Sequence, residues 1–181
     1  DKEYTMRIIT GQFKGRHFDI PRTFKARPTT DFAKENIFNV LNGYIDFDGI
    51  TALDLFAGTG SISLELVSRG CKEVVSVEKD RDHARFIADC MKKINAENDI
   101  LIRGDVFRFL KSCHQKFDLI FADPPYALPE LDTLPDLVFE HDLLAADGVF
   151  VFEHGKHNGF SAHPRFKEHR SYGSVNFSIF R

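Results

Sequence analysis

The stretch ITALDLFAGTG, residues 50–60, decides the fold. Its first seven residues form a largely apolar run, which is typical of a strand that is covered on both faces. Two glycines, Gly58 and Gly60, follow this run and allow the chain to turn tightly. Residues 61–69 then have helical spacing, and Gly70 stands where a helix would end. A strand, a glycine turn and a helix predict the first half of a βαβ unit.

The same alternation continues along the chain. Short apolar runs predict further strands, and segments with helical spacing between them predict helices. The expected strands are residues 73–78, 100–102, 117–122 and 148–153, and the expected helices are residues 80–95, 106–113 and 131–141. The predicted fold class is therefore α/β, a doubly wound, mostly parallel sheet with helices on both faces. In the tail, residues 166–181, Tyr172-Gly173 predicts a turn that closes an antiparallel strand pair.

The first 27 residues differ in charge from the rest of the chain. They hold seven lysines and arginines against three acidic residues, a net charge of +4. The other residues carry 17 positive and 24 negative side chains, a net charge of −7. Residues 1–27 read as a small β-hairpin extension turned at its glycines. Its basic charge predicts a local contact with a polyanion, through Arg7, Lys14 and Arg16.

Residues 28–181 form the predicted α/β domain, which begins with a helix that Thr30 or Asp31 caps. Of all residues, 43% are hydrophobic and 28% are charged, as in ordinary globular proteins. No run approaches the ~18 apolar residues of a membrane span. The chain also opens without a signal peptide. We therefore expect a cytoplasmic protein without a membrane partner, and a monomer by default.

The cysteines and histidines show no pattern of metal ligands. Cys71, Cys90 and Cys113 lie far apart, and none of the eight histidines completes a zinc pattern. We interpret the cysteines as buried thiols of a reducing compartment. The sequence therefore predicts no metal cofactor.

The turn after the first strand of the α/β domain is a candidate ligand site, because ligands bind such sheets beyond the carboxyl ends of the strands. The helix that follows Gly60 offers free N–H groups to a ligand. A dinucleotide site would place a third glycine at position 63, where this chain has Ser63. Asp54 would also repel a diphosphate, whereas it suits a cationic amino-acid moiety. These features disfavour a dinucleotide-binding oxidoreductase.

The next two strands also end in acidic residues. Glu78 closes the second strand, where a carboxylate can accept hydrogen bonds from both hydroxyls of a ribose. Asp105 follows the third strand and is placed to accept a hydrogen bond from an adenine amino group. A single acid at a strand end is more often solvated than bound to a ligand. Three acids after successive strands favour a nucleoside that carries an amino-acid moiety.

The tetrapeptide Asp123-Pro124-Pro125-Tyr126 follows the fourth strand and is the sharpest signal in the chain. Its two prolines stiffen the turn and remove two N–H donors. Tyr126 would stack on a flat base, while the Asp123 carboxylate and the Pro124 carbonyl accept the two protons of the amino group of that base. Such bonds favour a pyramidal nitrogen aimed at a methyl donor, and Asp123 can relay the proton that leaves.

Together these residues resemble the class I methyltransferases that modify amino groups, and the match extends to the bacterial RsmD family. The resemblance spans nearly the whole chain from Met6. The matching positions are residues 6–11, 14–16, 27–31, Glu35, Phe38, 54–60, 68–70, 77–78, Asp105, 123–126 and 172–173. The resemblance implies a Rossmann-like class I fold and the methylation of a guanine N2 in 16S ribosomal RNA, with S-adenosylmethionine as the methyl donor. It also implies a substrate within the small ribosomal subunit or its assembly intermediate.

The resemblance assigns site residues by position. The cofactor site of the family falls on Arg27, Thr29, Thr30, Asp54, Phe56, Gly58, Gly60, Glu78, Lys79, Asp105, Val106 and Asp123. Its catalytic residues fall on Asp123, Pro124, Pro125 and Tyr126. Residues 27–30 would close over the methionine end of the cofactor, and the basic hairpin would grip RNA. The chain departs from the family at Thr59, where serine is expected, and at Lys34, where arginine is usual; a lysine argues against a bidentate contact there.

Three other functions share part of this pattern. A DNA adenine-N6 or cytosine-N4 methyltransferase has the same catalytic tetrapeptide, but it needs a large region to read bases and extrude one of them. Few residues remain here outside the catalytic fold for that task. A protein glutamine methyltransferase normally carries asparagine in place of Asp123. A non-catalytic RNA-binding factor in ribosome assembly is disfavoured by the intact tetrapeptide and glycine loop.

Overall fold

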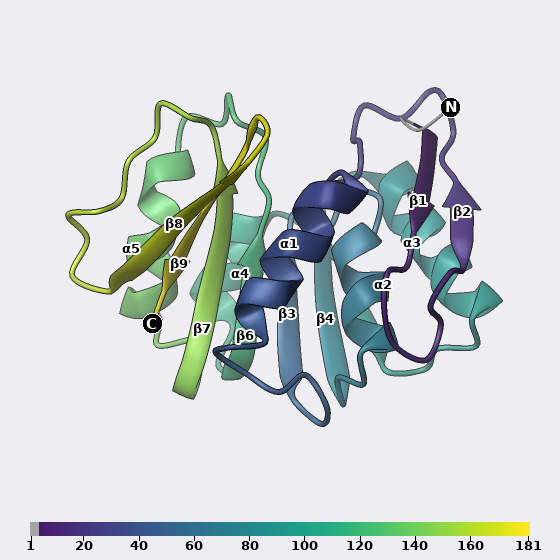
Figure 1. The fold of residues 1–181 in the computed structure, drawn as a ribbon, viewed down its shortest axis with the longest axis horizontal. Helices are drawn as coiled ribbons and strands as arrows, with labels where there is room; N and C mark the ends of the chain where they lie inside the picture. The colour runs from purple at the N-terminus through teal and green to yellow at the C-terminus, as the bar shows by residue number, and fades with distance from the viewer. Residues whose placement is uncertain (1–3) are drawn as a thin grey trace.

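The computed structural model describes residues 4–181, which form a seven-stranded sheet flanked by helices and a separate two-stranded sheet (Figure 1). The elements described are, in chain order, β1 (Thr5–Arg7), β2 (His17–Asp19), α1 (Asp31–Leu41), β3 (Thr51–Leu55), α2 (Ser61–Ser68), β4 (Glu73–Glu78), α3 (Arg81–Lys93), β5 (Asp99–Arg103), α4 (Val106–Ser112), β6 (Phe117–Ala122), the 3₁₀ helix η2 (Leu131–Thr133), α5 (Leu134–Glu140), β7 (Leu144–His154), β8 (Phe166–Tyr172) and β9 (Val175–Phe180).

The large sheet has the strand order β5-β4-β3-β6-β7-β9-β8. Strands β3 to β7 run parallel, and β9 pairs antiparallel with both β7 and β8. The order reverses at β3, since β4 and β5 lie on one side of it and β6 and β7 on the other. This confirms the predicted doubly wound, mostly parallel sheet with an antiparallel pair at its end. The carboxyl ends of β3 and β6 are neighbours at the point where a ligand is expected.

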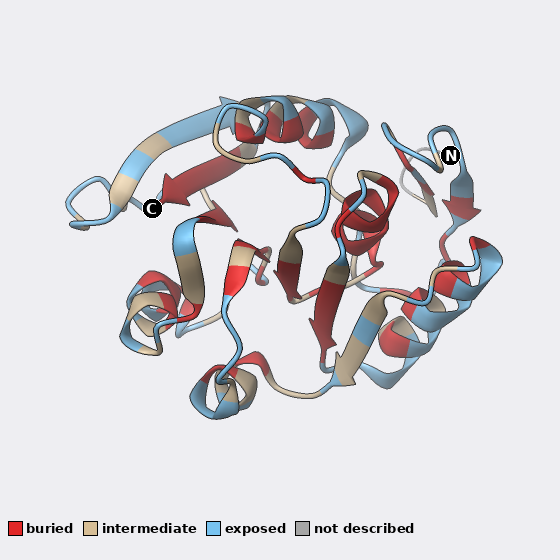
Figure 2. Ribbon diagram, turned by 90° about the horizontal axis from the view of Figure 1, so that it is seen from below, coloured by how far each residue is buried: buried red, intermediate tan, exposed pale blue. Residues whose placement is uncertain are grey.

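Helices cover both faces of the sheet. Successive side chains of a strand point to opposite faces, so Ala52 belongs to the core beneath α1, α2 and α3, and Leu53 to the core beneath α4 and α5. Figure 2 shows the buried residues gathered in the central strands and on the helix sides that face them. This two-faced burial explains the continuous apolar runs of the strands.

The N-terminal hairpin is shorter than the sequence suggests, because part of it packs on α2. The strands β1 and β2 pair over three residues each. Between them, Ile9 and Thr10 donate their backbone N–H groups to the Glu65 carboxylate at 2.8 and 3.1 Å. A Cβ on Gly11 would lie 2.0 Å from the Ser68 carbonyl oxygen, so only glycine allows the loop to approach α2 this closely. The hairpin is therefore fixed to α2 through a buried carboxylate.

Most predicted elements differ from the structure by one or two residues at their ends, and two others differ by more. β7 begins at Leu144 instead of residue 148, because Leu144 pairs with Phe117 ahead of a register shift. In the sequence, the dipeptide Asp147-Gly148 is typical of a turn, which predicts a strand that begins only after it. In the structure Asp147 has a left-handed backbone, but the strand continues through it. The helix predicted at residues 131–141 is divided into η2 and α5, where Pro135 lies in the first turn. Within residues 4–181, no helix is long and apolar enough to cross a membrane.

Candidate active site

The loop after β3 turns back on itself through three residues with left-handed backbone. Phe56, Gly58 and Gly60 have φ angles of 60°, 59° and 83°. A Cβ on Gly60 would lie 2.9 Å from Ile87 Cγ1 on α3, so glycine lets the loop pack tightly at this point. Phe56 adopts the same backbone region at an energetic cost that its surroundings must offset. The loop is thus held in one shape at the carboxyl end of β3.

Glu78 fastens this loop from the neighbouring strand. Its Oε1 accepts a hydrogen bond from the Gly58 N–H at 2.7 Å, and its Oε2 accepts one from the Asp80 N–H at 2.8 Å. His83 Nδ1 lies 3.8 Å from the same carboxylate, and Glu78 is only 9% exposed. A carboxylate offers about four lone-pair sites, so each oxygen can still accept one more hydrogen bond. Glu78 can therefore hold the loop and also bind the hydroxyls of a ligand.

Asp54 lies beneath the loop, in a buried chain of polar groups. Ser63 Oγ donates to Asp54 Oδ2 at 2.6 Å, and Ser76 Oγ donates to Asp99 Oδ1 at 2.6 Å. The two serine oxygens are themselves 2.6 Å apart. This row of hydrogen-bonded groups therefore joins a carboxyl group at the glycine loop to a second carboxyl group at the start of β5.

This row of hydrogen-bonded groups needs one proton more than its two serine hydroxyls supply. Three short oxygen–oxygen contacts need three protons, and the hydroxyls of Ser63 and Ser76 supply two of them. The third can come only from a carboxyl group: a protonated Asp54 would donate to Ser63 Oγ in place of accepting from it, and Ser63 Oγ would then donate to Ser76 Oγ. Burial raises the pKa of Asp54 to about 7 and the pKa of Asp99 to about 6, which agrees with a proton shared at neutral pH. Asp54 is thus placed as a buried, titrating carboxyl rather than as an open ligand contact.

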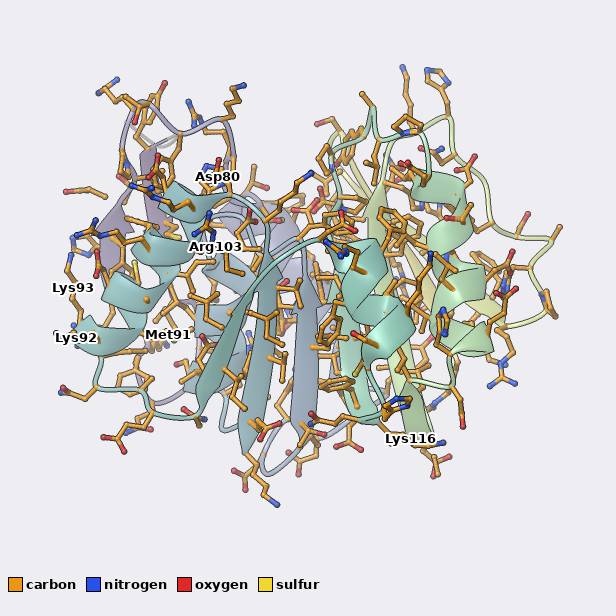
Figure 3. The ribbon with its side chains drawn as sticks, turned by 180° about the vertical axis from the view of Figure 1, so that it is seen from behind. Asp80, Met91, Lys92, Lys93, Arg103 and Lys116 are labelled. Atoms are coloured by element: carbon orange, nitrogen blue, oxygen red, sulfur yellow. The ribbon has the colours of Figure 1, made fainter. Side chains whose placement is uncertain are left out.

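The remaining predicted cofactor residues of this half lie at the ends of β4 and β5. Asp105 is partly exposed and caps α4 by accepting the Arg108 N–H at 3.0 Å, which leaves one carboxylate oxygen available. Val106 is 4% exposed, and Lys79 is exposed. Figure 3 labels Asp80 at this edge of the sheet, where it caps α3. The acids after β4 and β5 therefore share the edge of the glycine loop.

The tetrapeptide lies at the end of β6, beside the end of β3. The Asp123 N–H donates to the Leu55 carbonyl oxygen at 3.4 Å, which brings the turn next to the glycine loop. Pro124 is buried, whereas Pro125 and Tyr126 are exposed. Tyr126 is 47% exposed and its ring lies 3.8 Å from the position of a Cβ on Gly155. An aromatic face is thus presented at the edge where the strand order reverses.

Glu153, at the end of β7, is a site residue that the sequence analysis missed. Its Oε2 accepts the Tyr126 hydroxyl at 2.7 Å, and its Oε1 accepts the Thr29 hydroxyl at 3.2 Å. It is only 7% exposed. The rule that directed attention to acids after β3, β4, β5 and β6 also applies to β7, and it would have found this residue. Glu153 joins the turn at residues 123–126 to the segment that precedes α1.

Asp123 and Glu153 form a second pair of carboxyl groups. The pKa of Asp123 is raised well above its usual range, first by burial, then by the charge and hydrogen bonding of Glu153, and to a smaller degree by Asp54. Burial and the same glutamate also raise the pKa of Tyr126, so its hydroxyl stays protonated and donates. A carboxyl with a raised pKa is suited to accept a proton near neutral pH.

The segment at residues 27–30 makes contacts within the protein itself. The Arg27 guanidinium donates to the carbonyl oxygens of Phe24 and Ala26 and lies over the ring of Tyr4. Thr30 caps α1 by accepting the Ala33 N–H at 3.2 Å. With Thr29 bonded to Glu153, these contacts fix the segment beside the catalytic turn.

Lys34, where arginine is usual, acts as a buried point charge. Its Nζ lies 3.2 Å from Glu65 Oε1 and donates to the Arg7 carbonyl oxygen and to Ser61 Oγ. It is 1% exposed. It therefore joins the hairpin, α1 and the first turn of α2, and no bidentate contact is needed there.

The predicted RNA-binding residues lie on and around the hairpin. Arg7 forms an exposed ion pair with Asp31 at 3.1 Å, and Arg16 donates to the Lys93 carbonyl oxygen at 3.1 Å. Lys14 is exposed in the loop between β1 and β2. Figure 3 shows the side chains of Lys92 and Lys93 on the same flank of the molecule. The basic residues thus form a flank beside the cofactor half of the site.

A hollow of about 660 Å³ lies away from this edge, and Lys116, Phe139 and Arg165 contribute to its lining. It is located at the amino ends of β6 and β7, and Figure 3 shows Lys116 at the edge opposite to Asp80. We do not assign it to the active site.

The sheet order, the glycine loop and the tetrapeptide after β6 define a class I methyltransferase. The family model described as conserved hypothetical protein 95 matches residues 6–181. The ribosomal RNA small subunit methyltransferase D of Escherichia coli (strain K12) is 30% identical over 159 residues, which cover 88% of this chain and 79% of that protein. The chain belongs to this methyltransferase D family, which confirms the predicted resemblance to RsmD.

Two further comparisons agree with this assignment. YlbH of Bacillus subtilis (strain 168), named provisionally as an rRNA methyltransferase, is 36% identical over 155 residues, 83% of each chain. The solved structure of the hypothetical protein TTHA0928 of Thermus thermophilus superposes with a TM-score of 0.85 at 27% identity, over 97% of this chain and 99% of that one. The prediction that the chain is a methyltransferase enzyme is therefore confirmed.

Proposed function

We propose that this protein transfers a methyl group from S-adenosylmethionine to the exocyclic N2 of a guanine in 16S ribosomal RNA. The observation that carries the proposal is the position of Asp123-Pro-Pro-Tyr126 at the end of β6, beside the glycine loop. The family relative in E. coli is named a small-subunit rRNA methyltransferase. The RNA substrate would place the activity in the cytoplasm, on the small ribosomal subunit or its assembly intermediate.

The residues at the ends of β3, β4 and β5 fit the proposed cofactor. The Glu78 carboxylate has lone pairs left for ribose hydroxyls, and Asp105 has one oxygen free for an adenine amino group. Asp54 supplies a negative charge beneath the loop for the cationic amino-acid end. When bound, S-adenosylmethionine supplies a methyl group on a positively charged sulfur. The other residues proposed for the lining are Lys79, Val106, Phe56, Arg27, Thr29 and Thr30.

The residues of the tetrapeptide would prepare the amino group for transfer. Tyr126 provides a stacking face for the base, and the Pro124 carbonyl and the Asp123 carboxylate accept its amino protons. Pro125 keeps the turn stiff, so these acceptors stay fixed. Asp123 then takes up the proton that nitrogen loses as the N–C bond forms. Alignment of the reacting atoms would supply most of the remaining acceleration.

The basic hairpin would hold the RNA near this edge. Arg7, Lys14 and Arg16 are exposed on it, and phosphate contacts of this kind position a substrate without reading its sequence. The hairpin is fixed to α2 through Glu65, so it holds a constant place relative to the glycine loop. We propose that the protein acts as a monomer without a metal ion.

The test is the transfer of labelled methyl groups from S-adenosylmethionine to small ribosomal subunits that lack their own modifications. Free 16S rRNA and duplex DNA serve as parallel substrates. We expect label in the RNA of the particles and little in DNA. Label in DNA would agree with the proposed amino methylation but would reject 16S rRNA as the substrate. Cofactor binding without transfer to any ribosomal substrate would favour a non-catalytic assembly factor.

A further inference from the structure

The catalytic turn does not fix itself: its exposed aromatic residue is held by an acid from the next strand. The Tyr126 hydroxyl donates to Glu153 Oε2 at 2.7 Å, while Tyr126 remains 47% exposed. A half-exposed tyrosine would otherwise sample several rotamers. The bond to a buried carboxylate, with the backbone of Gly155 beside the ring, selects one orientation.

The same carboxylate reaches a third segment of the chain. Glu153 Oε1 accepts the Thr29 hydroxyl at 3.2 Å, although these residues are 124 positions apart in the sequence. Thr29 lies one residue before the cap of α1, in the segment that the family resemblance places over the cofactor. Both oxygens of Glu153 are therefore used to join elements on either side of the reacting atoms.

Glu153 also faces the proposed proton acceptor. The Asp123 carboxyl lies within the electrostatic reach of Glu153, and Asp54 adds negative charge from β3. The other titratable group that contacts Glu153 is Tyr126. The His154 side chain of β7 instead bonds to Ser178 and interacts with Glu153 only as a nearby charge. Burial first, and then the nearby Glu153, raise the pKa of Asp123, which makes its carboxylate a stronger proton acceptor.

We propose that Glu153 is a positioning residue of the methyl transfer, which fixes the Tyr126 side chain and the Thr29 segment through its two carboxylate oxygens. This inference rests on the proposed function. In the reaction one N–C bond forms, the S–C bond of the donor breaks with its electron pair staying on sulfur, and one amino proton leaves the nitrogen. The leaving proton goes to the Asp123 carboxylate, and Glu153 acts by holding Tyr126 and Thr29 in place.

The test compares Glu153→Gln with Tyr126→Phe in single-turnover transfer from about pH 5 to pH 9, and uses whichever amino-bearing substrate the wild-type protein methylates. We expect Glu153→Gln to lower the transfer rate roughly 10- to 100-fold, within the range of acid–base effects. Its cofactor Kd should rise by a smaller factor than the rate falls, because Thr29 is the proposed cofactor residue that Glu153 holds by a hydrogen bond, and Glu78 keeps its own bonds. Without the charge of Glu153, the acid limb of the rate profile should move to lower pH.

Tyr126→Phe keeps the ring and the charge of Glu153 but removes the hydroxyl bond. It should slow transfer by a smaller factor and leave the acid limb in place. The double variant should be less impaired than the product of the two single effects, because both act on one contact. Glu168→Gln, a partly exposed acid paired with Arg170 on β8, is the matched control and should retain the wild-type rate and profile.

A wild-type rate and an unmoved acid limb in Glu153→Gln would overturn the proposal. So would a parallel loss of cofactor affinity and thermal stability, which would assign Glu153 a structural role. Where Glu153→Gln does not fold, Glu153→Asp replaces it: a rate that falls more than the cofactor affinity supports the proposal, and a wild-type rate rejects it. A wild-type protein that methylates DNA instead of rRNA would reject the proposed substrate and leave this inference open to the same test.

Discussion

The two halves of the active-site edge treat their carboxyl groups differently. At the ends of β4 and β5, Glu78 and Asp105 accept hydrogen bonds from backbone N–H groups of neighbouring turns. At the ends of β6 and β7, Asp123 faces another acid, Glu153, whose donors come from side chains of distant segments. Backbone donors thus orient the carboxylates at the ends of β4 and β5, and each keeps lone pairs for a ligand. The catalytic half is arranged to accept protons, and an amino group is suited to supply them.

The largest expected effect separates the halves directly. Asp123→Ala should lower the transfer rate by about 10²- to 10⁴-fold, because it removes the proton acceptor. Cofactor affinity, measured by calorimetry, should stay within about twofold, since the loop and Glu78 keep their bonds. The exposed Glu140→Ala on α5 is the control. A loss of cofactor affinity equal to the loss of rate would show that the halves are not separate.

Glu78→Ala should break the other half. It removes a charged acceptor from the ribose, so we expect the cofactor Kd to rise by about 10- to 100-fold. It also leaves the N–H groups of Gly58 and Asp80 without their acceptor, and the free energy of unfolding should fall by about 1–3 kcal/mol. At saturating cofactor the rate should recover. A transfer rate that stays low at saturating cofactor, with a normal cofactor Kd, would contradict the roles assigned to Glu78 and Asp123.

Charge reversal on the hairpin should leave both halves intact. Replacing Arg7, Lys14 and Arg16 by glutamate should weaken RNA binding about tenfold or more. The slope of the logarithm of the binding constant against the logarithm of the salt concentration should become less steep by about 2. Equal reversals at the exposed side chains of Lys72, Lys111 and Lys116 are the matched control. Filter binding between roughly 50 and 200 mM salt gives the slope. An unchanged slope would reject the role of the hairpin.

The smallest expected effect concerns the buried chain beneath the glycine loop. Because the pKa of Asp54 is raised to about 7, its carboxylate is charged above that pH and neutral below it. A cationic cofactor favours the charged form, so affinity should weaken as pH falls, by up to about tenfold from roughly pH 7 to pH 6. Asp54→Asn should flatten this dependence. A wild-type affinity that stays constant from about pH 6 to pH 8 would contradict the titration of Asp54.

The sequence predicted what depends on local pattern. The βαβ alternation, the glycine loop and the tetrapeptide are short and contiguous, so their residue types and spacing define them. The strand-end rule directed attention to the acids at positions 54, 78 and 105, and the family resemblance added the further cofactor positions, among them residues 27–30. The doubly wound arrangement was accessible because parallel crossovers follow few topologies.

Contacts between distant segments could not be read from the same pattern. Nothing in the sequence indicated that Glu65 would accept two backbone N–H groups of the hairpin loop, or that Lys34 would be buried beside it. Ser63 served only to argue against a dinucleotide, whereas in the structure it bonds to Asp54. Glu153 was overlooked because the strand-end rule was not extended to β7, although its contacts with Tyr126 and Thr29 could be known only from the structure.

The central claim is that this site methylates an amino nitrogen of a base in small-subunit rRNA. The most direct measurement is to digest the RNA of labelled particles and identify the methylated nucleoside by mass spectrometry. The account predicts N2-methylguanosine, absent when the Asp123→Ala variant replaces the wild-type protein. A methyl group on another base, on ribose or on a ribosomal protein, or one that persists in Asp123→Ala, would contradict it.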